Sequence, residues 1–181
     1  MPTSMKVRKF QIILAAAVVA VVSFWLYHLS TPPAISLASS SAWSPSGPQA
    51  RLRSVKLWIA SHEVVAEVAS GPVELATGMM FRTNLAPNEA MLFLLPVAQQ
   101  AKFYMRNTFI PLSCAYMDDE GVILETHDMK PKDETLILSA SANVRFVLEV
   151  NRGWFEANHV NPGVLVRTDK GTLSDLLRMS N

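Results

Sequence analysis

The stretch that decides the fold runs from Ala101 to Gly121 and reads AKFYMRNTFIPLSCAYMDDEG. Two apolar segments, 102–105 and 110–117, flank the polar triplet Arg106-Asn107-Thr108. The second segment ends in Asp118-Asp119-Glu120-Gly121, and acidic residues followed by a glycine that tolerates positive φ are typical of a hairpin turn. The stretch therefore predicts two strands, a polar corner between them, and a hairpin that leads into a third strand from residue 122.

On either side of this stretch, short apolar runs alternate with turn signals. Residues 55–59 and 63–69 are two such runs around a polar break, which predicts another hairpin. Pro72 and Gly78 bracket a helix of about two turns, because proline favours the first helical position and glycine ends helices. Further strands are predicted at 91–95 (ended by Pro96), 144–150 and 164–166, with short helices after 153 and 172. The fold class is α+β and β-rich: a small, partly closed antiparallel or mixed β-barrel-like domain with two or three short helices.

The amino-terminal part of the chain differs in composition from the rest. Residues 1–9 are basic, and Phe10–Tyr27 is an uncharged apolar run of 18 residues, close to the roughly 20 that cross a bilayer as a helix. We expect residues 1–28 to form an N-terminal hydrophobic helix that acts as a signal-anchor or, alternatively, as a cleaved signal peptide. A Ser/Pro-rich linker is expected at 29–50, one β-rich globular domain at 51–168, and a C-terminal tail with a short helix at 169–181.

The charge of the amino terminus also predicts the location of the domain. Basic residues before an apolar run keep the short amino terminus in the cytoplasm. We therefore expect a single-pass inner-membrane protein with its C-terminal domain in the periplasm, or a protein secreted to the periplasm if the signal is cleaved.

Net charge and cysteine content exclude several classes of protein. Without Lys6, Arg8 and Lys9, 13 of the 16 basic residues remain against 15 acidic residues. A faintly acidic domain lacks the positive surface that binds nucleic acid, so we expect no nucleic-acid partner. Cys114 is the only cysteine, which excludes an internal disulfide and a four-cysteine metal site, and we expect it to be a small buried apolar residue. We expect no cofactor.

Five segments in a fixed order resemble a known family. They are Glu67–Arg82, Asn88–Pro96, Phe103–Leu112, Asp118–Ile123 and Val147–Val160. Together they resemble the prokaryotic family called domain of unknown function 192, over roughly residues 55 to 166. In that family the third segment reads Trp-Met-Lys-Asn-Thr-x-Ile-Pro-Leu-Asp, and an upstream Gly-Leu-Met-x-Arg is similar to residues 78–82 here.

The resemblance implies a compact β-rich fold that is often exported behind a signal or anchor, and it implies no activity. Three positions depart from the family pattern: Tyr104 replaces a tryptophan, Arg106 a lysine and Ser113 an aspartate. If that aspartate takes part in chemistry in relatives, this chain has lost it. The departure weakens an enzymatic interpretation.

The polar corner supplies the candidate ligand-binding residues. Those expected to line a surface cleft are Arg82, Tyr104, Arg106, Asn107 and Thr108. An arginine can hold a carboxylate or phosphate through two hydrogen bonds, and the amide, hydroxyl and aromatic groups add further contacts. The alternative is structural, because Asn-Thr at a corner commonly satisfies backbone groups and Arg82 can pair with Glu67 or Glu89.

Glu125 and His127 are secondary candidates for acid–base chemistry, because they share one face of the predicted strand. Two ligands on one face are fewer than the three that a catalytic zinc needs. We therefore expect a solvated strand face and no metal.

These observations lead to one functional hypothesis and two alternatives. We expect a non-enzymatic, envelope-tethered binding or accessory module with a polar cleft for a small anionic ligand or peptide. The alternatives are an enzyme that acts on an envelope component through Glu125 and His127, and a structural part of an envelope protein complex. The expected partners are the membrane, through Phe10–Tyr27, and an unknown small ligand or envelope protein.

Overall fold

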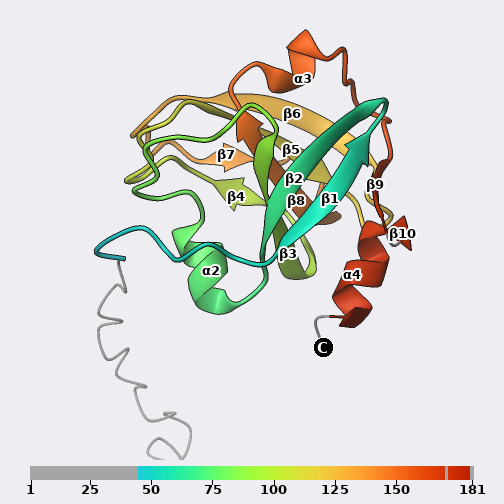
Figure 1. Ribbon diagram of the computed structural model, residues 1–181, viewed down its shortest axis with the longest axis horizontal. Coiled ribbons are helices and arrows are strands. Elements are labelled where there is room, and N and C mark those ends of the chain that lie inside the picture. Colours follow the sequence, from blue (N-terminus) through green and yellow to red (C-terminus); the bar gives the residue numbers. More distant parts are fainter. Residues whose placement is uncertain (1–44, 170, 180–181) are drawn as a thin grey trace, which may run out of the picture. The chain divides into compact units, whose positions relative to one another are not determined.

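The computed structural model describes residues 45–169 and 171–179. The expected hydrophobic helix at 1–28 and most of the expected linker lie outside the described residues. Within the described ranges, no helix is both long and apolar enough to cross a bilayer. These ranges contain ten strands and three short helices, a β-rich α+β fold as predicted (Figure 1).

Eight strands form one mixed sheet, and two short strands pair beside it. The strand order of the large sheet is β10 (Gly171–Thr172), β9 (Val166–Thr168), β1 (Ser54–Ile59), β2 (His62–Ala69), β3 (Glu89–Gln99), β8 (Val144–Asn151), β5 (Leu112–Met117) and β6 (Ile123–Met129). The small sheet pairs β4 (Lys102–Phe103) with β7 (Ile137–Leu138). The helices are α2 (Pro72–Thr77), α3 (Trp154–Ala157) and α4 (Leu173–Met179).

The connection from β2 to β3 is the one parallel step in the described sheet, and α2 lies within it. Pro72 starts this helix, as the sequence predicts. The Glu74 carboxylate accepts hydrogen bonds from the backbone N–H groups of Ser70 and Gly71, each at 2.8 Å. Gly78 ends the helix with φ of 49°, and glycine adopts such a positive φ without the strain that a side chain would cause. The local sequence therefore fixes both ends of α2.

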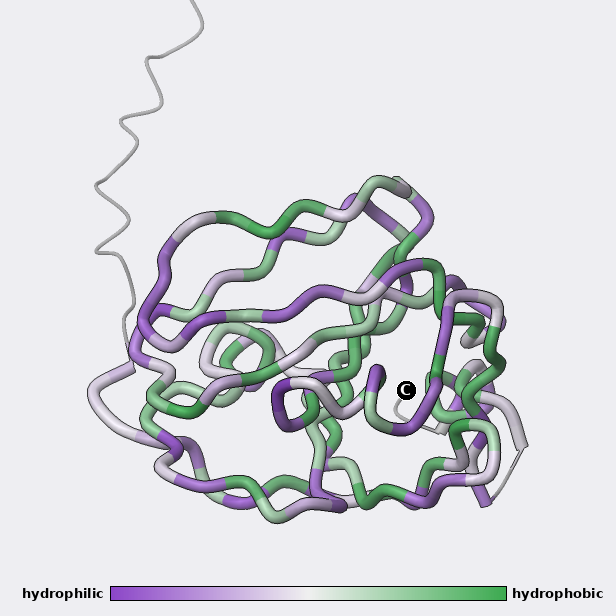
Figure 2. Tube along the Cα trace, turned by 90° about the horizontal axis from the view of Figure 1, so that it is seen from above, coloured by the Kyte–Doolittle hydropathy of each residue, from purple (hydrophilic) through white to green (hydrophobic). Residues whose placement is uncertain are grey.

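The central strands are buried on both faces, and successive side chains enter two different cores. In β3, Leu92 and Leu94 belong to the first core, which also contains Phe155 of α3 and Leu173 of α4. The second core lies on the opposite face, beneath α2 and the β4–β7 sheet, and contains Phe93 of β3. Figure 2 shows hydrophobic residues recurring along the strands and hydrophilic residues gathered at many of the turns.

Two details of the strands differ from the expectation. The strand order ends at β10 and β6, and in the described residues no strand pairing joins these ends. Near β6 and β9 the chain is linked by an isolated bridge, Val122 to Leu165, and by backbone hydrogen bonds between residues 121–123 and 163–166. The sheet is therefore open, and the partial barrel closure is not supported. Pro96 does not end β3, because the pairing of β3 with β8 shifts register between Leu94 and Gln99, and an irregularity of this kind tolerates a proline.

Candidate functional site

Arg82 is held in an ion-pair network around Glu67. The Glu67 carboxylate accepts hydrogen bonds from Arg82 Nη2 at 2.9 Å, Arg51 Nη1 at 2.8 Å and the backbone N–H of Leu52 at 2.7 Å. Burial by itself would raise the pKa of Glu67, but these three donors hold it below its ordinary value. The network ties the start of the domain to β2 and engages Arg82 through Nη2, while Arg82 Nε is buried without a hydrogen-bond partner among the described residues.

Arg106 and Asn107 also serve the local structure. Asn107 has φ of 54°, a left-handed conformation that asparagine tolerates better than most residues, and its carbonyl accepts a hydrogen bond from the Phe81 N–H at 2.7 Å. Arg106 is exposed and pairs with Glu134 at 2.9 Å. These contacts stabilise a turn. Neither Arg106 nor Asn107 lines the pocket described below.

Tyr104 and Thr108 face a pocket that the polar corner helps to form. Tyr104 is half-buried, and the Arg106 guanidinium lies 5.3 Å from the centre of its ring. Thr108 is buried, and its carbonyl accepts a hydrogen bond from the Lys132 N–H at 3.0 Å. Of the five candidate residues, the structure therefore brings these two together in one pocket and places the other three outside it.

Glu125 and His127 form a pair on β6, outside this pocket. His127 Nε2 lies 2.8 Å from Glu125 Oε2, and the other carboxylate oxygen accepts a hydrogen bond from the Ala140 N–H. The imidazole lies 5.4 Å from the ring of Tyr116, measured between ring centres. Among the described residues, no three His, Cys, Asp or Glu side chains converge to hold a metal ion.

A cavity of about 270 Å³ lies between α2, the loop that follows it, and the β4 segment; we call it the α2–β4 pocket. Its apolar lining comprises the side chains of Leu75, Ala76, Met79, Met80, Phe93, Leu95 and Phe103. Its polar side chains are Thr77, Lys102, Tyr104, Thr108 and Glu149. Ligand pockets commonly span roughly 300–1,000 Å³ and combine apolar walls with a few fixed polar groups. This cavity lies just below that range in volume and has the same kind of lining, so it could hold only a small molecule.

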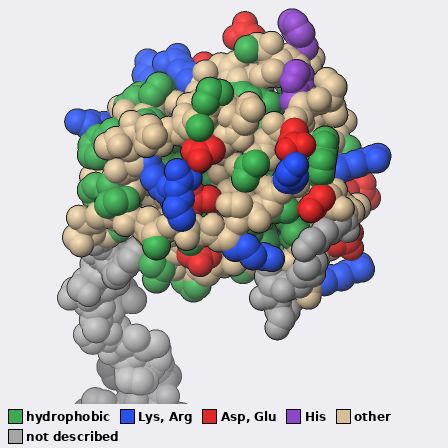
Figure 3. Space-filling model, viewed as in Figure 1, with side chains coloured by type: hydrophobic (Ala, Val, Ile, Leu, Met, Phe, Trp, Pro, Cys, Tyr) green, Lys and Arg blue, Asp and Glu red, His purple; other side chains and the backbone are tan. Residues whose placement is uncertain are grey.

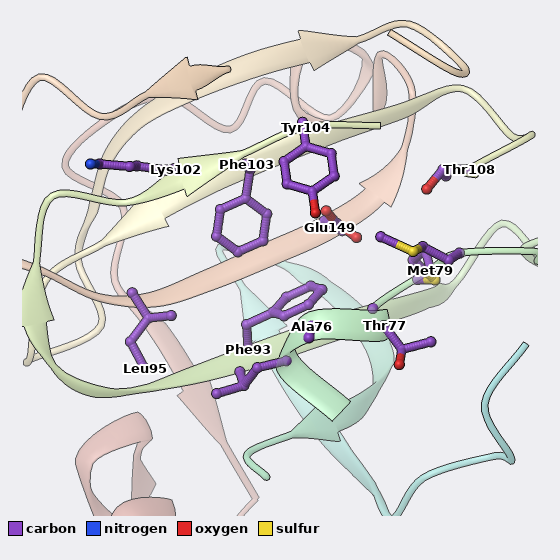
Figure 4. Close-up of a pocket in the computed structure, with 13 residues that line it drawn as sticks. Ala76, Thr77, Met79, Phe93, Leu95, Lys102, Phe103, Tyr104, Thr108 and Glu149 are labelled. Atoms are coloured by element: carbon purple, nitrogen blue, oxygen red, sulfur yellow. The ribbon is translucent and has the colours of Figure 1, made fainter. Parts of the chain in front are cut away.

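Glu149 of β8 forms the floor of the α2–β4 pocket. Its side chain is almost fully buried, and burial alone raises the pKa of its carboxyl to about 8. Within the described residues, no donor forms a hydrogen bond or ion pair with it. In Figure 4 the hydroxyl of Tyr104 points toward this carboxyl, whereas the amine of Lys102 points away from it. The floor is therefore an acid that burial keeps protonated near neutral pH and that no group in residues 45–169 or 171–179 pairs with.

Strand register explains why Glu149 is buried there. On its two neighbouring strands, Glu149 lies opposite Met91 of β3 and Cys114 of β5, both of which belong to the second core. Cys114 is fully buried, as expected, and desolvation raises the pKa of its thiol to about 12. Glu149 therefore occupies a core position whose other members are apolar or neutral.

Sequence reasoning missed Glu149, although a signal was present. The strand predicted at 144–150 is almost continuously apolar, and such strands are typically buried on both faces. A glutamate inside it must be paired, neutral or functional, since a buried charge without a partner is very unfavourable. The prediction treated the strand only as core.

Comparison with known proteins gives the class to which this domain belongs. The sequence profile of the family described as "Uncharacterized ACR" (DUF192) matches residues 55–168. The match spans more than half of the chain, so the chain belongs to this family, as the resemblance predicted. The family is one of unknown function, and no curated protein matches the chain.

Two solved structures are similar to the chain. One is described as a putative transcription regulator from Sinorhizobium meliloti 1021, with 28% identity, a TM-score of 0.63, and coverage of 66% of this chain and 97% of its own. The other is a protein of unknown function from Novosphingobium aromaticivorans DSM 12444, with 32% identity, a TM-score of 0.61, and coverage of 70% of this chain and 94% of its own.

We predict that Arg82→Ala destabilises the protein without acting on the pocket. The Arg82 side chain is 12% exposed, and its removal leaves the buried Glu67 with two donors, so a loss of about 2 kcal/mol in unfolding free energy is expected. Arg51→Ala removes the 58% exposed partner of the same carboxylate and should cost less than about 1 kcal/mol. Urea denaturation of both variants measures the difference. Equal losses would contradict the assigned role of Arg82.

We predict that Glu149→Gln stabilises the protein increasingly as pH rises. The pKa of Glu149 is raised to about 8 in the folded state, against about 4.3 in an unfolded chain. The folded state is therefore not penalised below the unfolded value, loses stability progressively as pH rises from the unfolded towards the folded value, by roughly 3 to 4 kcal/mol at pH 7, and loses little more above the folded value. Glutamine does not titrate, so the gain should be small at pH 5 and large at pH 8 in denaturant titrations. Glu120→Gln, on an exposed turn, is the matched control, and a gain that is independent of pH would contradict the prediction.

Proposed function

We propose that this domain is a binding module that takes a small organic molecule into the α2–β4 pocket. The observation that carries the proposal is Glu149, a buried carboxyl that has no partner among the described residues and lines a mostly apolar cavity. Unsatisfied buried polar groups are unfavourable, and a ligand that pairs with one removes that penalty. The apolar walls would supply affinity, and the few polar groups would orient the bound molecule.

The proposal moves the site from the expected polar cleft to a neighbouring pocket and changes the expected ligand. The anionic ligand was expected because Arg82 and Arg106 offered free forks, but Glu67 and Glu134 already engage them. An anion in the pocket would also face the Glu149 carboxyl. On the face drawn in Figure 3, acidic and basic side chains are interspersed, which gives an anion no preferred approach there.

Entry to the pocket is proposed to pass the exposed side of α2. Ala76 lines the pocket and is exposed, so a large side chain there would occupy the entrance. Val73 lies one turn earlier in the same helix and is 57% exposed, and it does not line the pocket. The helix therefore offers a blocking position and a matched control.

We predict that Ala76→Trp abolishes ligand-induced stabilisation, whereas Val73→Trp preserves it. The probe is a set of aromatic and aliphatic fragments bearing amine, alcohol, amide or carboxylate groups, screened by thermal shift. A fragment at about 100 times its Kd stabilises the native state by about 2.7 kcal/mol, enough to raise Tm by several degrees. If no fragment raises Tm, or if the shifts survive in Ala76→Trp, the pocket is not the binding site.

We also propose that the domain is anchored to the inner membrane and lies in the periplasm. The support is the sequence of residues 1–28, where three basic residues precede an uncharged apolar run. Alkaline phosphatase fused after Asn181 is expected to be active, because that enzyme needs the oxidising periplasm for its disulfides. A second fusion places, at the same position, a fluorescent reporter that is active only in the cytoplasm. Fluorescence of this fusion, together with an inactive phosphatase fusion, would contradict the proposed location.

A further inference from the structure

We infer that the ligand of the α2–β4 pocket is an organic ammonium ion, whose charged nitrogen lies between the Glu149 carboxylate and the rings of Phe93, Phe103 and Tyr104. The inference rests on the proposed function and adds the chemical class of the ligand. It follows from three features of the pocket: an unpaired acid, a group of aromatic rings around it, and the lack of a competing cation.

The first feature is the position of the acid. Glu149 is 4% exposed and lines the pocket. Once ionised, a carboxylate can only accept hydrogen bonds, so its natural complement is a donor that carries positive charge. A charge-assisted hydrogen bond is roughly twice as strong as one between neutral groups, and the low dielectric of a buried site strengthens it further.

The second feature is the group of aromatic side chains next to the acid. Phe93 and Phe103 pack edge to face, with ring centres 5.1 Å apart and planes at 88°. Figure 4 shows the rings of Phe93, Phe103 and Tyr104 around the Glu149 carboxyl. Aromatic faces attract cations through their quadrupole, and aromatic rings grouped in this way bind ammonium groups in proteins. An alcohol or amide would gain the hydrogen bond but little of this attraction.

The third feature is the charge around the acid. Lys102 also lines the pocket, but it is exposed and its amine points away from Glu149 (Figure 4). On the strand beside Glu149, burial raises the pKa values of Cys114 and Tyr116, so both side chains are neutral at pH 7. The guanidinium of Arg106 lies over the Tyr104 ring and is paired with Glu134. Among the described residues no cation forms an ion pair with Glu149, so an incoming ammonium ion would supply the counter-charge.

Binding of a cation should be coupled to loss of the Glu149 proton. The free carboxyl is protonated at neutral pH, because burial raises its pKa to about 8. An ammonium ligand favours the ionised form, so one proton leaves the carboxyl for solvent while the ligand keeps its own. The affinity should therefore rise about tenfold per pH unit between pH 5.5 and 7.5 and level off above pH 8. A neutral ligand that binds the protonated acid would not show this rise.

The test compares ligands that share a carbon framework and differ in the polar group and its charge. Three frameworks (benzyl, cyclohexylmethyl and isobutyl) are each used as the amine, the alcohol and the carboxylate, and binding to the full chain is measured by titration calorimetry. Measurements at pH 7 in buffers of different ionisation enthalpy count the protons released. At least one amine is expected to bind tenfold or more tightly than its alcohol and to release close to one proton, while its carboxylate shows no binding.

Variants then assign the effect to the pocket. Glu149→Gln should remove the preference for the amine, its pH dependence and the proton release, whereas Glu120→Gln should leave all three unchanged. Phe103→Leu keeps an apolar wall and should weaken the binding of the amine more than the binding of the alcohol. Alcohols or carboxylates that bind as tightly as the amines and compete for the pocket would overturn the inference while the proposed function stands. If no fragment binds in a manner sensitive to Ala76→Trp, both fail.

Discussion

The structure depends on the burial of its central strands on both faces. Because the buried parts of β3, β5 and β8 lie between two cores, each buried side chain along them must be apolar, hydrogen-bonded or neutral. A hydroxyl meets this requirement by pairing, as Ser113 does with Asp128. A carboxyl meets it only with several donors or by keeping its proton. This condition determines how the two buried glutamates of the sheet behave.

Glu67 and Glu149 face the same side of the sheet, in register with Met91 between them. Glu67 is near the start of the domain, where two arginines and a backbone N–H reach it, and its pKa is lowered despite burial. Glu149 lies further into the sheet, where its neighbours are core residues and the pocket, and its pKa is raised. Two glutamates on the same face of the sheet thus behave differently. Glu67 is an ionised residue with a structural role, and Glu149 is an acid that has no partner among the described residues. The difference arises from the donors within reach.

Local signals predicted much of this fold. The β1–β2 hairpin, the ends of α2 and the turn at Gly121 follow from residues adjacent in sequence. Openness of the sheet and the continuation of β3 past Pro96 depend on pairing between distant strands, which composition does not encode. The polar corner was located, but the partners of Arg82 and Arg106 come from residues 15 and 28 positions away. For the same reason Tyr104 and Thr108 could be chosen from sequence, whereas the relation of Glu149 to them needed strand order.

The energetics of Glu149 favour a ligand over a purely structural role. A valine or leucine at this position would join the apolar second core without desolvating a carboxyl, and replacement of buried charged groups by apolar ones often stabilises proteins. A structural role would require donors, and among the described residues Glu149 has none. Functional groups commonly reduce the stability of the fold that holds them, because they are arranged for a partner that is absent from the free protein. Glu149 has this property together with an adjoining cavity and an aromatic lining, so its unfavourable burial supports the proposal of a bound ligand.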